Sequence, residues 1–523
     1  MTARSPSFES RPSTSFQRAG DSATQSEAVL AAGQAAASIG QHSAAFHLFI
    51  AFSTIIAAVA AFAVWTPFGF VATVLITAVL AVSLPAGMPT VIACAFLFQN
   101  LVVAWFTPFV PDDATFDALR GANFVILMTI FGLFLPAAFQ ARVRALPALR
   151  PWLHLIFALC AVITLYLALG AVRGGPKDAV IYFRNTITPL ACFHIALLAA
   201  SLYRVDMRLP VACLCAIAVG YGYLEQIFRM DFLALFHGDL YVQRGLKEQI
   251  EAGVWEKALR ETGFVLRGLE DTMTATFFNT AFFGDALPRI FRNGGPNFHP
   301  ISYAYVLSLS SAWLLFRGRW LLPLAAFPLL LVIGSKGAAF LLAVALAARM
   351  TYRPTRPRRT LIAVVFLAAV WTAAATAYGA RHGDYHVLGL IAGVRDFLGN
   401  PLGQGLGIGG NLSSASANLD WDRAQGEGAA AVPVESAVAV MLYQMGIGSF
   451  VFFGFLAALA VSAGRRLIET GRPDFLFAFV AIVTISANAV LQEEAFFSPL
   501  ALGLALLLTG VSFGTHIRAA ASR

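Results

Sequence analysis

The stretch that decides the fold is RWLLPLAAFPLLLVIG-SK-GAAFLLAVALAARM, residues 319–350. Two apolar runs follow each other here, and only Ser335 and Lys336 separate them. A lysine deep inside a bilayer costs roughly 2.5–3.5 kcal/mol, whereas a lysine at the interface extends to the headgroups at little cost. We therefore expect two membrane helices joined by a turn that holds Lys336 at one membrane surface.

The composition of the whole chain agrees with this reading. Of the 523 residues, 58% are hydrophobic and only 12% are charged, and the mean hydropathy is +0.73. These values are typical of a polytopic membrane protein rather than a soluble one. The net charge of +8 could indicate nucleic-acid binding, but the positive residues lie between the apolar runs and act as a topology signal. No nucleic-acid partner is expected.

Continuous apolar runs of about 17–25 residues predict an all-α integral membrane bundle of about fourteen spanning helices. The predicted spans are 44–65, 69–85, 88–107, 123–141, 152–171, 179–203, 209–226, 300–316, 318–334, 337–352, 360–378, 436–462, 474–491 and 497–515.

The distribution of arginine sets the expected orientation of these spans. Arginines gather in the N-terminal tail, in alternate connections and at the C-terminus, whereas the short loops of the other side hold only Arg120, Arg173, Lys177 and Lys336. Segments rich in Lys and Arg stay in the cytoplasm. Both termini are therefore predicted to be cytoplasmic, and Lys336 to face outward.

Two long outer loops interrupt the spans and divide the chain into parts. The tail is rich in Ser, Ala, Gln and Thr and is expected to be disordered. The predicted parts are a cytoplasmic tail (1–43), N-terminal spans (44–226), a first outer loop (227–299), central spans (300–378), a second outer loop (379–435), and C-terminal spans with a short tail (436–523).

Each outer loop has its own pattern. In the first loop, Leu246, Ile250 and Val254 recur at helical spacing, which predicts an amphipathic helix that lies either on the membrane or on the bundle. The second loop carries six glycines within 399–410, which predicts a flexible backbone that could approach a ligand closely. This run lacks the lysine of a phosphate-binding P-loop, so nucleotide binding is rejected.

The polar residues that could bind a ligand or take part in a reaction gather on the predicted outer face. Arg292 and Lys336 could recognise a pyrophosphate, because arginine offers a planar fork and lysine a point charge; the alternative is simple contact with lipid headgroups. The whole set on this face is Arg292, His299, Lys336, Arg381, His382, His386, Arg395, Glu435, Glu493 and Glu494.

Four of the candidates have a structural reading beside the functional one. His299 precedes Pro300 and suits the start of a helix as well as catalysis. Glu435 opens a long apolar helix, either as an N-terminal cap or as a general base. His386 could be a base, a phosphate ligand or a packing residue. Arg184 lies inside the sixth span, and an intramembrane charge is a functional-site candidate.

Four segments, taken in order, resemble the family of bacterial O-antigen ligases and Wzy-type polysaccharide polymerases. Each motif is short, and the resemblance covers roughly residues 290–515. The segments are Arg292-x-x-Gly leading to His299-Pro300, Gly334-Ser-Lys-Gly-Ala-Ala-Phe340, Asn400-Pro-Leu-Gly-Gln-Gly-Leu-Gly407, and Glu435-Ser followed by Gly446-Ile-Gly.

The chain also departs from the family pattern. Lys336 stands where the family usually has arginine, so the charge is kept and the bidentate fork is lost. Phe340 replaces a leucine, and Ser449 replaces a glycine. Glu435 stands where the ligases carry histidine, which favours a polymerase over a ligase. His386 lies about where related proteins place a loop arginine.

The resemblance implies a GT-C-like bundle in the bacterial inner membrane, with an active site on the periplasmic face. An undecaprenyl-pyrophosphate-linked glycan would be the donor, and a hydroxyl of the next lipid-linked repeat unit would attack it. Arg292 and Lys336, helped by Arg381 and Arg395, would bind the pyrophosphate. Either Glu435 or His386 would accept the proton, with Arg184, His299, Glu493 and Glu494 as further candidates.

This scheme names its partners and leaves two alternatives. The partners are a lipid-linked oligosaccharide, membrane lipids and other polysaccharide-assembly proteins. No metal or cofactor is expected, since fixed cations would carry the charge of the leaving group and no metal-ligand spacing such as HExxH occurs. The alternatives are an O-antigen ligase that transfers glycan to lipid A core, and a flippase or transporter.

Overall fold

The computed structural model describes residues 44–523, apart from 252–267, 280–288, 415, 417–418 and 420. Within this described part, nine helices are long and apolar enough to cross a membrane, or ten if one bent pair is counted as a single span. The chain is therefore an all-α protein of membrane type, as predicted. The predicted disordered tail, 1–43, lies outside the described residues.

The long helices follow the apolar runs of the sequence. The bent pair consists of α4 (Asp113–Arg120) and α5 (Ala122–Ala137), which meet at 43°. The other long helices are Ala44–Val64, α2 (Thr66–Ser83), α3 (Met88–Phe106), α7 (Arg150–Arg173), α8 (Pro176–Leu202), α9 (Arg208–Leu235), α16 (Pro357–His382), α19 (Ala437–Met445) continued by α20 (Ser449–Thr470), and α23 (Leu504–Ala521).

Four further apolar helices are shorter than a bilayer is thick. A helix needs about 20 residues to cross the hydrocarbon core, and these have 13 to 17. Each of the fourteen predicted spans overlaps a helix, but the number of membrane crossings stays a prediction. The four helices are α13 (Pro300–Phe316), α14 (Leu321–Ile333), α15 (Lys336–Thr351) and α21 (Pro473–Asn488).

The remaining elements are short and lie in the connections. Strands β1 (Thr274–Ala275) and β2 (Ile290–Phe291) form a two-stranded antiparallel sheet, with Thr274 opposite Phe291. The other helices are α6 (Ala141–Arg144), α10 (Gly238–Glu251), α12 (Leu269–Thr272), α17 (Tyr385–Gly399), α18 (Trp421–Glu427) and α22 (Glu494–Phe497), and the tighter or wider single turns are Pro85–Gly87, Thr107–Phe109, Pro147–Leu149, Phe277–Asn279, Gly446–Gly448 and Pro499–Gly503.

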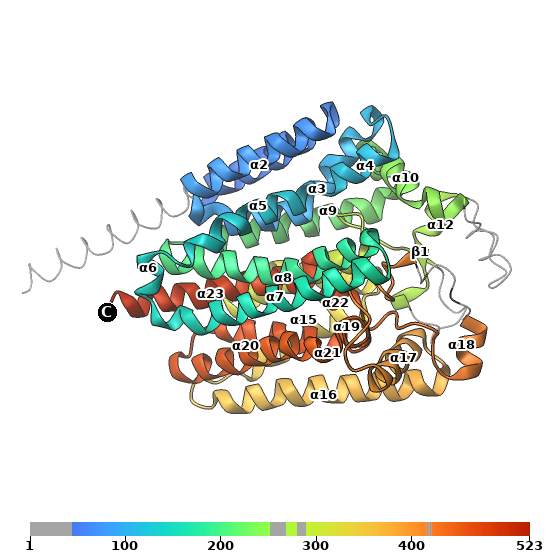
Figure 1. Ribbon diagram of the computed structural model, residues 1–523. Coiled ribbons are helices and arrows are strands. Elements are labelled where there is room, and N and C mark those ends of the chain that lie inside the picture. The colour runs from blue at the N-terminus through green and yellow to red at the C-terminus, as the bar shows by residue number, and fades with distance from the viewer. Residues whose placement is uncertain (1–43, 252–267, 280–288, 415, 417–418, 420) are drawn as a thin grey trace, which may run out of the picture.

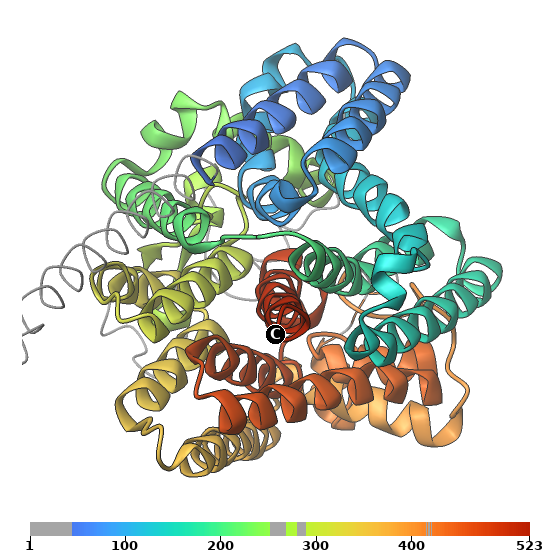
Figure 2. The same ribbon diagram turned by 90° about the vertical axis from the view of Figure 1, so that its left-hand side faces the viewer.

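Two helices, α8 and α23, form the centre of the bundle. Figure 2 looks along the bundle and shows α23 surrounded by the other helices. A Cβ atom added to Gly510 would lie 2.8 Å from the Phe193 carbonyl oxygen, and one added to Gly514 would lie 2.4 Å from that of Leu197. The two glycines, four residues apart, therefore let the backbones of α8 and α23 approach closely, as small residues do between membrane helices.

The two ends of the bundle differ. The C-terminus lies at one end, and α10, α12, β1 and α18 lie at the opposite end, which is the predicted outer end (Figure 1). Helix α9 continues past the predicted boundary at residue 227 to Leu235, with a kink at Arg229, where φ is 47°. Helix α10 covers the first part of the expected helix, and much of the rest of that segment lies outside the described residues.

The glycine-rich segment 399–410 is a packed connection, which corrects the expectation of a flexible backbone. The backbone N–H of Gln404 donates to the Tyr443 carbonyl oxygen at 2.9 Å, and that of Leu406 donates to the Tyr166 carbonyl oxygen at 3.0 Å. The segment thus runs between α7 and α19 with its peptide groups paired to both. Its glycines serve close packing of backbone on backbone.

Candidate active site

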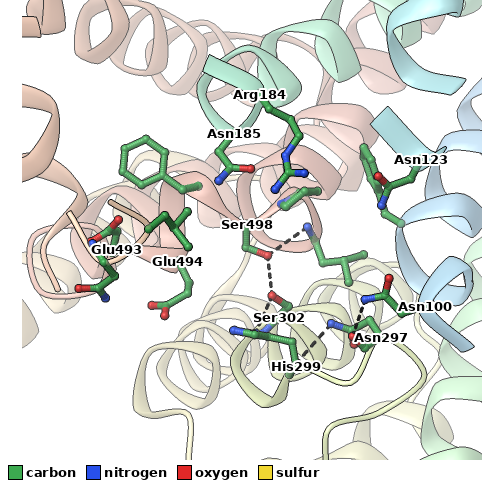
Figure 3. Close-up of a pocket in the computed structure, with 16 residues that line it drawn as sticks. Asn100, Asn123, Arg184, Asn185, Asn297, His299, Ser302, Glu493, Glu494 and Ser498 are labelled. Atoms are coloured by element: carbon green, nitrogen blue, oxygen red, sulfur yellow. Dashed lines mark hydrogen bonds between the residues drawn. The ribbon is translucent and has the colours of Figure 1, made fainter. Parts of the chain in front are cut away.

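A polar cavity of about 270 Å³ lies toward the predicted outer end of the bundle (Figure 3). Its walls come from α3, α5, α8, the start of α13, the end of the glycine-rich segment and the turns around α22. The residues that line it are Phe96, Asn100, Asn123, Arg184, Asn185, Asn297, His299, Ser302, Asn411, Leu412, Glu493, Glu494, Phe497, Ser498, Pro499 and Leu500.

Four of the sequence candidates meet in this cavity. Arg184, His299, Glu493 and Glu494 all line it, although they come from three distant parts of the chain. Figure 3 shows Glu493 and Glu494 on one side, Arg184 across from them, and His299 on the wall below. The cavity therefore combines a cation, an imidazole and two carboxyl groups.

His299 begins helix α13, as the sequence predicts. Pro300 occupies the first turn of the helix, and Nδ1 of His299 accepts a hydrogen bond from the Ser302 backbone N–H at 3.3 Å. Burial, aided by the positive charge of Arg292, lowers the pKa of His299 to about 4. The imidazole is therefore neutral at physiological pH, with Nδ1 as the acceptor and Nε2 carrying the hydrogen.

Glu493 is held by two partners that sequence reasoning missed. The Tyr182 hydroxyl donates to its Oε1 at 2.6 Å, and the Asn411 backbone N–H donates to its Oε2 at 2.9 Å. Burial raises the pKa of Glu493 to about 8 despite these hydrogen bonds. The carboxyl group is therefore fixed in place and keeps its proton near neutral pH.

The pKa of Glu493 predicts how the stability of the protein changes with pH. Because its pKa is about 8 in the folded chain and ordinarily 4.5, the folded state holds a proton that the unfolded state has lost. The free energy of unfolding should therefore fall between pH 6.5 and 8, by up to about 1.4 kcal/mol per pH unit from this group, and then level off. His299, whose pKa is lowered, makes the free energy of unfolding rise with pH, but this contribution is confined to pH values below 6.5.

The measurement is the apparent unfolding temperature of the purified protein in detergent between pH 6.5 and 8.5. Glu493→Gln should flatten the profile, whereas Glu469→Gln should leave it unchanged, because Glu469 is an exposed carboxylate that pairs with Arg466 at 3.1 Å. A profile equally steep in parent and Glu493→Gln would contradict the assignment.

A second group of predicted residues, Arg292, Lys336, His386 and Glu435, does not line the cavity, and we name it the outer cluster. Nε of Arg292 donates to the Ile333 carbonyl oxygen at 2.8 Å, which places Arg292 next to the turn that carries Lys336. Lys336 begins α15 and is exposed. The two proposed pyrophosphate ligands therefore lie on neighbouring backbone segments.

The other half of the outer cluster is a contact between His386 and Glu435. Nδ1 of His386 lies 3.4 Å from Oε2 of Glu435 and also 3.4 Å from its backbone oxygen. Burial raises the pKa of the nearby Glu494, and Glu435 adds to this, whereas His386 and Arg292 act in the opposite direction. Glu494 thus links the cavity to the outer cluster.

Glu435 does not cap helix α19, which corrects one of the two readings of this residue. The cap is Ser436, whose Oγ accepts a hydrogen bond from the Ala439 backbone N–H at 3.2 Å. The backbone N–H of Glu435 donates to Oδ1 of Asn411 at 3.2 Å, and its φ is 61°. This unusual left-handed conformation for a non-glycine residue directs its side chain to His386.

Two of the predicted pyrophosphate ligands lie elsewhere. Arg381 is exposed in the last turn of α16, and Arg395 is exposed on α17, where its Nε lies 3.9 Å from Asp396. Neither lines the polar cavity. Arg292 therefore lies beside the turn that carries Lys336, whereas Arg381 and Arg395 lie on α16 and α17, away from the polar cavity.

One buried acid that sequence reasoning missed holds a backbone segment of the site in place. Glu225 in α9 is fully buried and accepts hydrogen bonds from the backbone N–H groups of Gly294 and Gly295 at 2.9 and 3.0 Å. It thereby anchors the segment between Arg292 and His299. An acidic residue within an apolar span was the available signal.

Comparisons of the chain with protein-family models, with curated protein sequences and with solved structures return no match. Among the described residues, no three His, Cys, Asp or Glu side chains come together as a metal ion would require. The site must therefore be interpreted from its own geometry.

Proposed function

We propose that the protein is a membrane glycosyltransferase that polymerises undecaprenyl-pyrophosphate-linked repeat units on the periplasmic face of the bacterial inner membrane. The observation that carries this proposal is the position of Glu494. Its carboxyl group lines the polar cavity and is within electrostatic range of Arg292, His386 and Glu435. The cavity would hold the sugar. Next to it, Arg292 would stabilise the leaving group, and Glu435 with His386 would accept the proton.

The reaction uses each part of the site in turn. The hydroxyl oxygen of the incoming repeat unit forms a bond to the anomeric carbon of the donor glycan. The bond from that carbon to the pyrophosphate oxygen breaks, and its electron pair leaves with undecaprenyl pyrophosphate. Arg292 and Lys336 stabilise the negative charge that develops there, and the hydroxyl proton passes to Glu435, which His386 orients.

The polymerase is favoured over two alternatives. A ligase would share the chemistry and differ in its acceptor, and Glu435 at the position of the ligase histidine argues for the polymerase. Transporters usually bind substrate near the bilayer midplane between broken helices. Here the candidate groups lie toward one end of the bundle, under the segments that contain α10, α12, α17 and α18.

Glu435→Gln is expected to lower the rate of polymer formation about 10²-fold or more, because the amide cannot accept the proton. The rate is measured in membranes supplied with lipid-linked repeat units. Glu427→Gln is the matched control, since Glu427 lies in the same outer loop, is exposed and pairs with Arg423 at 2.7 Å. Equal rates in the two variants would assign the proton transfer to another residue.

The test of the function is a deletion strain whose lipid-linked glycans and surface polymer are analysed. A polymerase predicts single repeat units on undecaprenyl pyrophosphate and no long chains, with recovery by the parent gene. Long chains on undecaprenyl pyrophosphate that never join lipid A core would indicate a ligase. Repeat units confined to the cytoplasmic leaflet would indicate a flippase and overturn the proposal.

A further inference from the structure

Arg184 is a charged side chain in the polar cavity that the proposed reaction does not use. It lies in α8, one of the two central helices, and its guanidinium points into the cavity (Figure 3). In the part of the chain that the structure describes, it forms no salt bridge with an acidic residue and no side-chain hydrogen bond. Arg120, whose charge acts on Arg184, is already paired with Asp117 at 3.3 Å.

An unpaired charge at this position needs a partner. Arg184 is half-buried, and a charged group that is removed from water carries an effective penalty, up to several kcal/mol when fully buried, unless an opposite charge or hydrogen bonds offset it. Glu493 does not offset it, because its raised pKa keeps that carboxyl group protonated near neutral pH. Glu494 also lines the cavity but forms no ion pair with Arg184, so the positive charge of Arg184 has no ion-pair partner among the described residues.

The neighbours of Arg184 are amides with free hydrogen-bonding capacity. Asn123 and Asn185 line the cavity beside it, and neither side chain forms a hydrogen bond with a described residue. Asn100 donates from Nδ2 to the Asn297 carbonyl oxygen at 2.8 Å, which leaves its Oδ1 for a ligand. Each amide offers both donors and acceptors, the combination that adjacent sugar hydroxyls require.

The charge and size of the cavity restrict the ligand. One unpaired cation matches a ligand group with a single negative charge, and a pyrophosphate carries more than one. The volume of about 270 Å³ is slightly below the range of about 300–1,000 Å³ for small-molecule sites, and suits one sugar ring. Arginine binds a carboxylate through two parallel hydrogen bonds.

We infer that Arg184, with Asn123 and Asn185, forms a subsite for the carboxylate and hydroxyl groups of a hexuronic acid residue in the glycan. This inference rests on the proposed function, since the glycan of the repeat unit would carry the acidic sugar. It makes Arg184 a specificity-determining residue and leaves the pyrophosphate to Arg292 and Lys336.

The experiment uses the purified full-length protein in detergent and three probes, D-glucuronate, D-glucose and farnesyl pyrophosphate. Binding is followed by saturation-transfer NMR. The parent protein should bind glucuronate more tightly than glucose, and Arg184→Gln should weaken glucuronate binding at least tenfold and leave farnesyl pyrophosphate binding unchanged. Arg395→Gln, which removes an exposed arginine outside the cavity, should bind all three probes as the parent does.

Two further variants distinguish a loss of ligand binding from a loss of folded protein. Arg184→Lys keeps the charge and should retain part of the preference for glucuronate. Asn185→Asp places a carboxylate beside Arg184 and should weaken glucuronate binding more than glucose binding. The gel-filtration profile of each variant reports whether it is folded.

Three results would overturn the inference: equal binding of glucuronate and glucose by the parent, unchanged glucuronate binding in folded Arg184→Gln or Asn185→Asp, or loss of farnesyl pyrophosphate binding in place of glucuronate binding. The last would assign Arg184 to the leaving group. The polymerase proposal is judged separately by the glycans of the deletion strain, so the two can fail independently.

Discussion

Lys336→Ala is expected to lower the rate of polymer formation about 10²–10³-fold, which is the usual effect of removing one group that stabilises developing negative charge. Lys336 is exposed at the first residue of α15. Its loss should therefore leave the protein folded in the membrane, with the same amount and the same gel-filtration profile as the parent. The defect should lie in chemistry and not in assembly.

The controls for this prediction come from the same face of the bundle. Lys177 is an exposed lysine in the first turn of α8, and Lys177→Ala should retain full activity. Lys336→Arg, which keeps the positive charge at this position, should retain much of the rate. Full activity of Lys336→Ala in membranes would rule out a role for this lysine in binding the pyrophosphate.

Gly405→Ala is expected to lower the apparent unfolding temperature and the yield of folded protein. Gly405 has a φ of 109°, a backbone conformation that residues other than glycine rarely adopt. An added Cβ would lie 2.4 Å from the backbone nitrogen of Gly170, and neither backbone can move without breaking the contact between the glycine-rich segment and α7. Overpacking of this kind costs about 1–3 kcal/mol, and the left-handed conformation adds to that figure.

Gly399→Ala provides the matched substitution at the first residue of the same segment. No atom lies within 4 Å of its added Cβ, and its backbone is not in the left-handed region. The measurement is the yield of detergent-extracted protein and its apparent unfolding temperature. A Gly405→Ala variant as stable as Gly399→Ala would show that the segment is less tightly packed than the structure indicates.

The helices could be predicted because their signal is local. A continuous apolar run must be buried in the protein or lie in lipid. There it forms a helix, because a helix pairs its own backbone N–H and C=O groups by hydrogen bonds. The predicted span 360–378 thus falls within α16 (Pro357–His382), and His299 begins α13 because Pro300 suits a first turn. The predicted ends of the helices were less accurate. Helix α9, for example, continues past its predicted end to Leu235 through a kink at Arg229.

The role of Glu435 shows where local reasoning ends. Glutamate and serine follow each other before α19, and either could cap the helix. The structure selects Ser436, because Asn411 accepts a hydrogen bond from the Glu435 backbone N–H and holds that residue in a left-handed conformation. Asn411 lies 24 residues earlier in the chain, so no local pattern could reveal this.

The sequence by itself determined the class of the protein, the positions of its helices and the list of polar residues worth attention, since apolar runs and isolated charges are properties of neighbouring residues. Only the tertiary structure decided that Arg184, His299 and Glu493 share one cavity, and that Arg381 and Arg395 lie outside it. The hydrogen bond between Tyr182 and Glu493 joins residues 311 positions apart. Such a site depends on how distant helices pack, and packing is set by side-chain shape across the whole bundle.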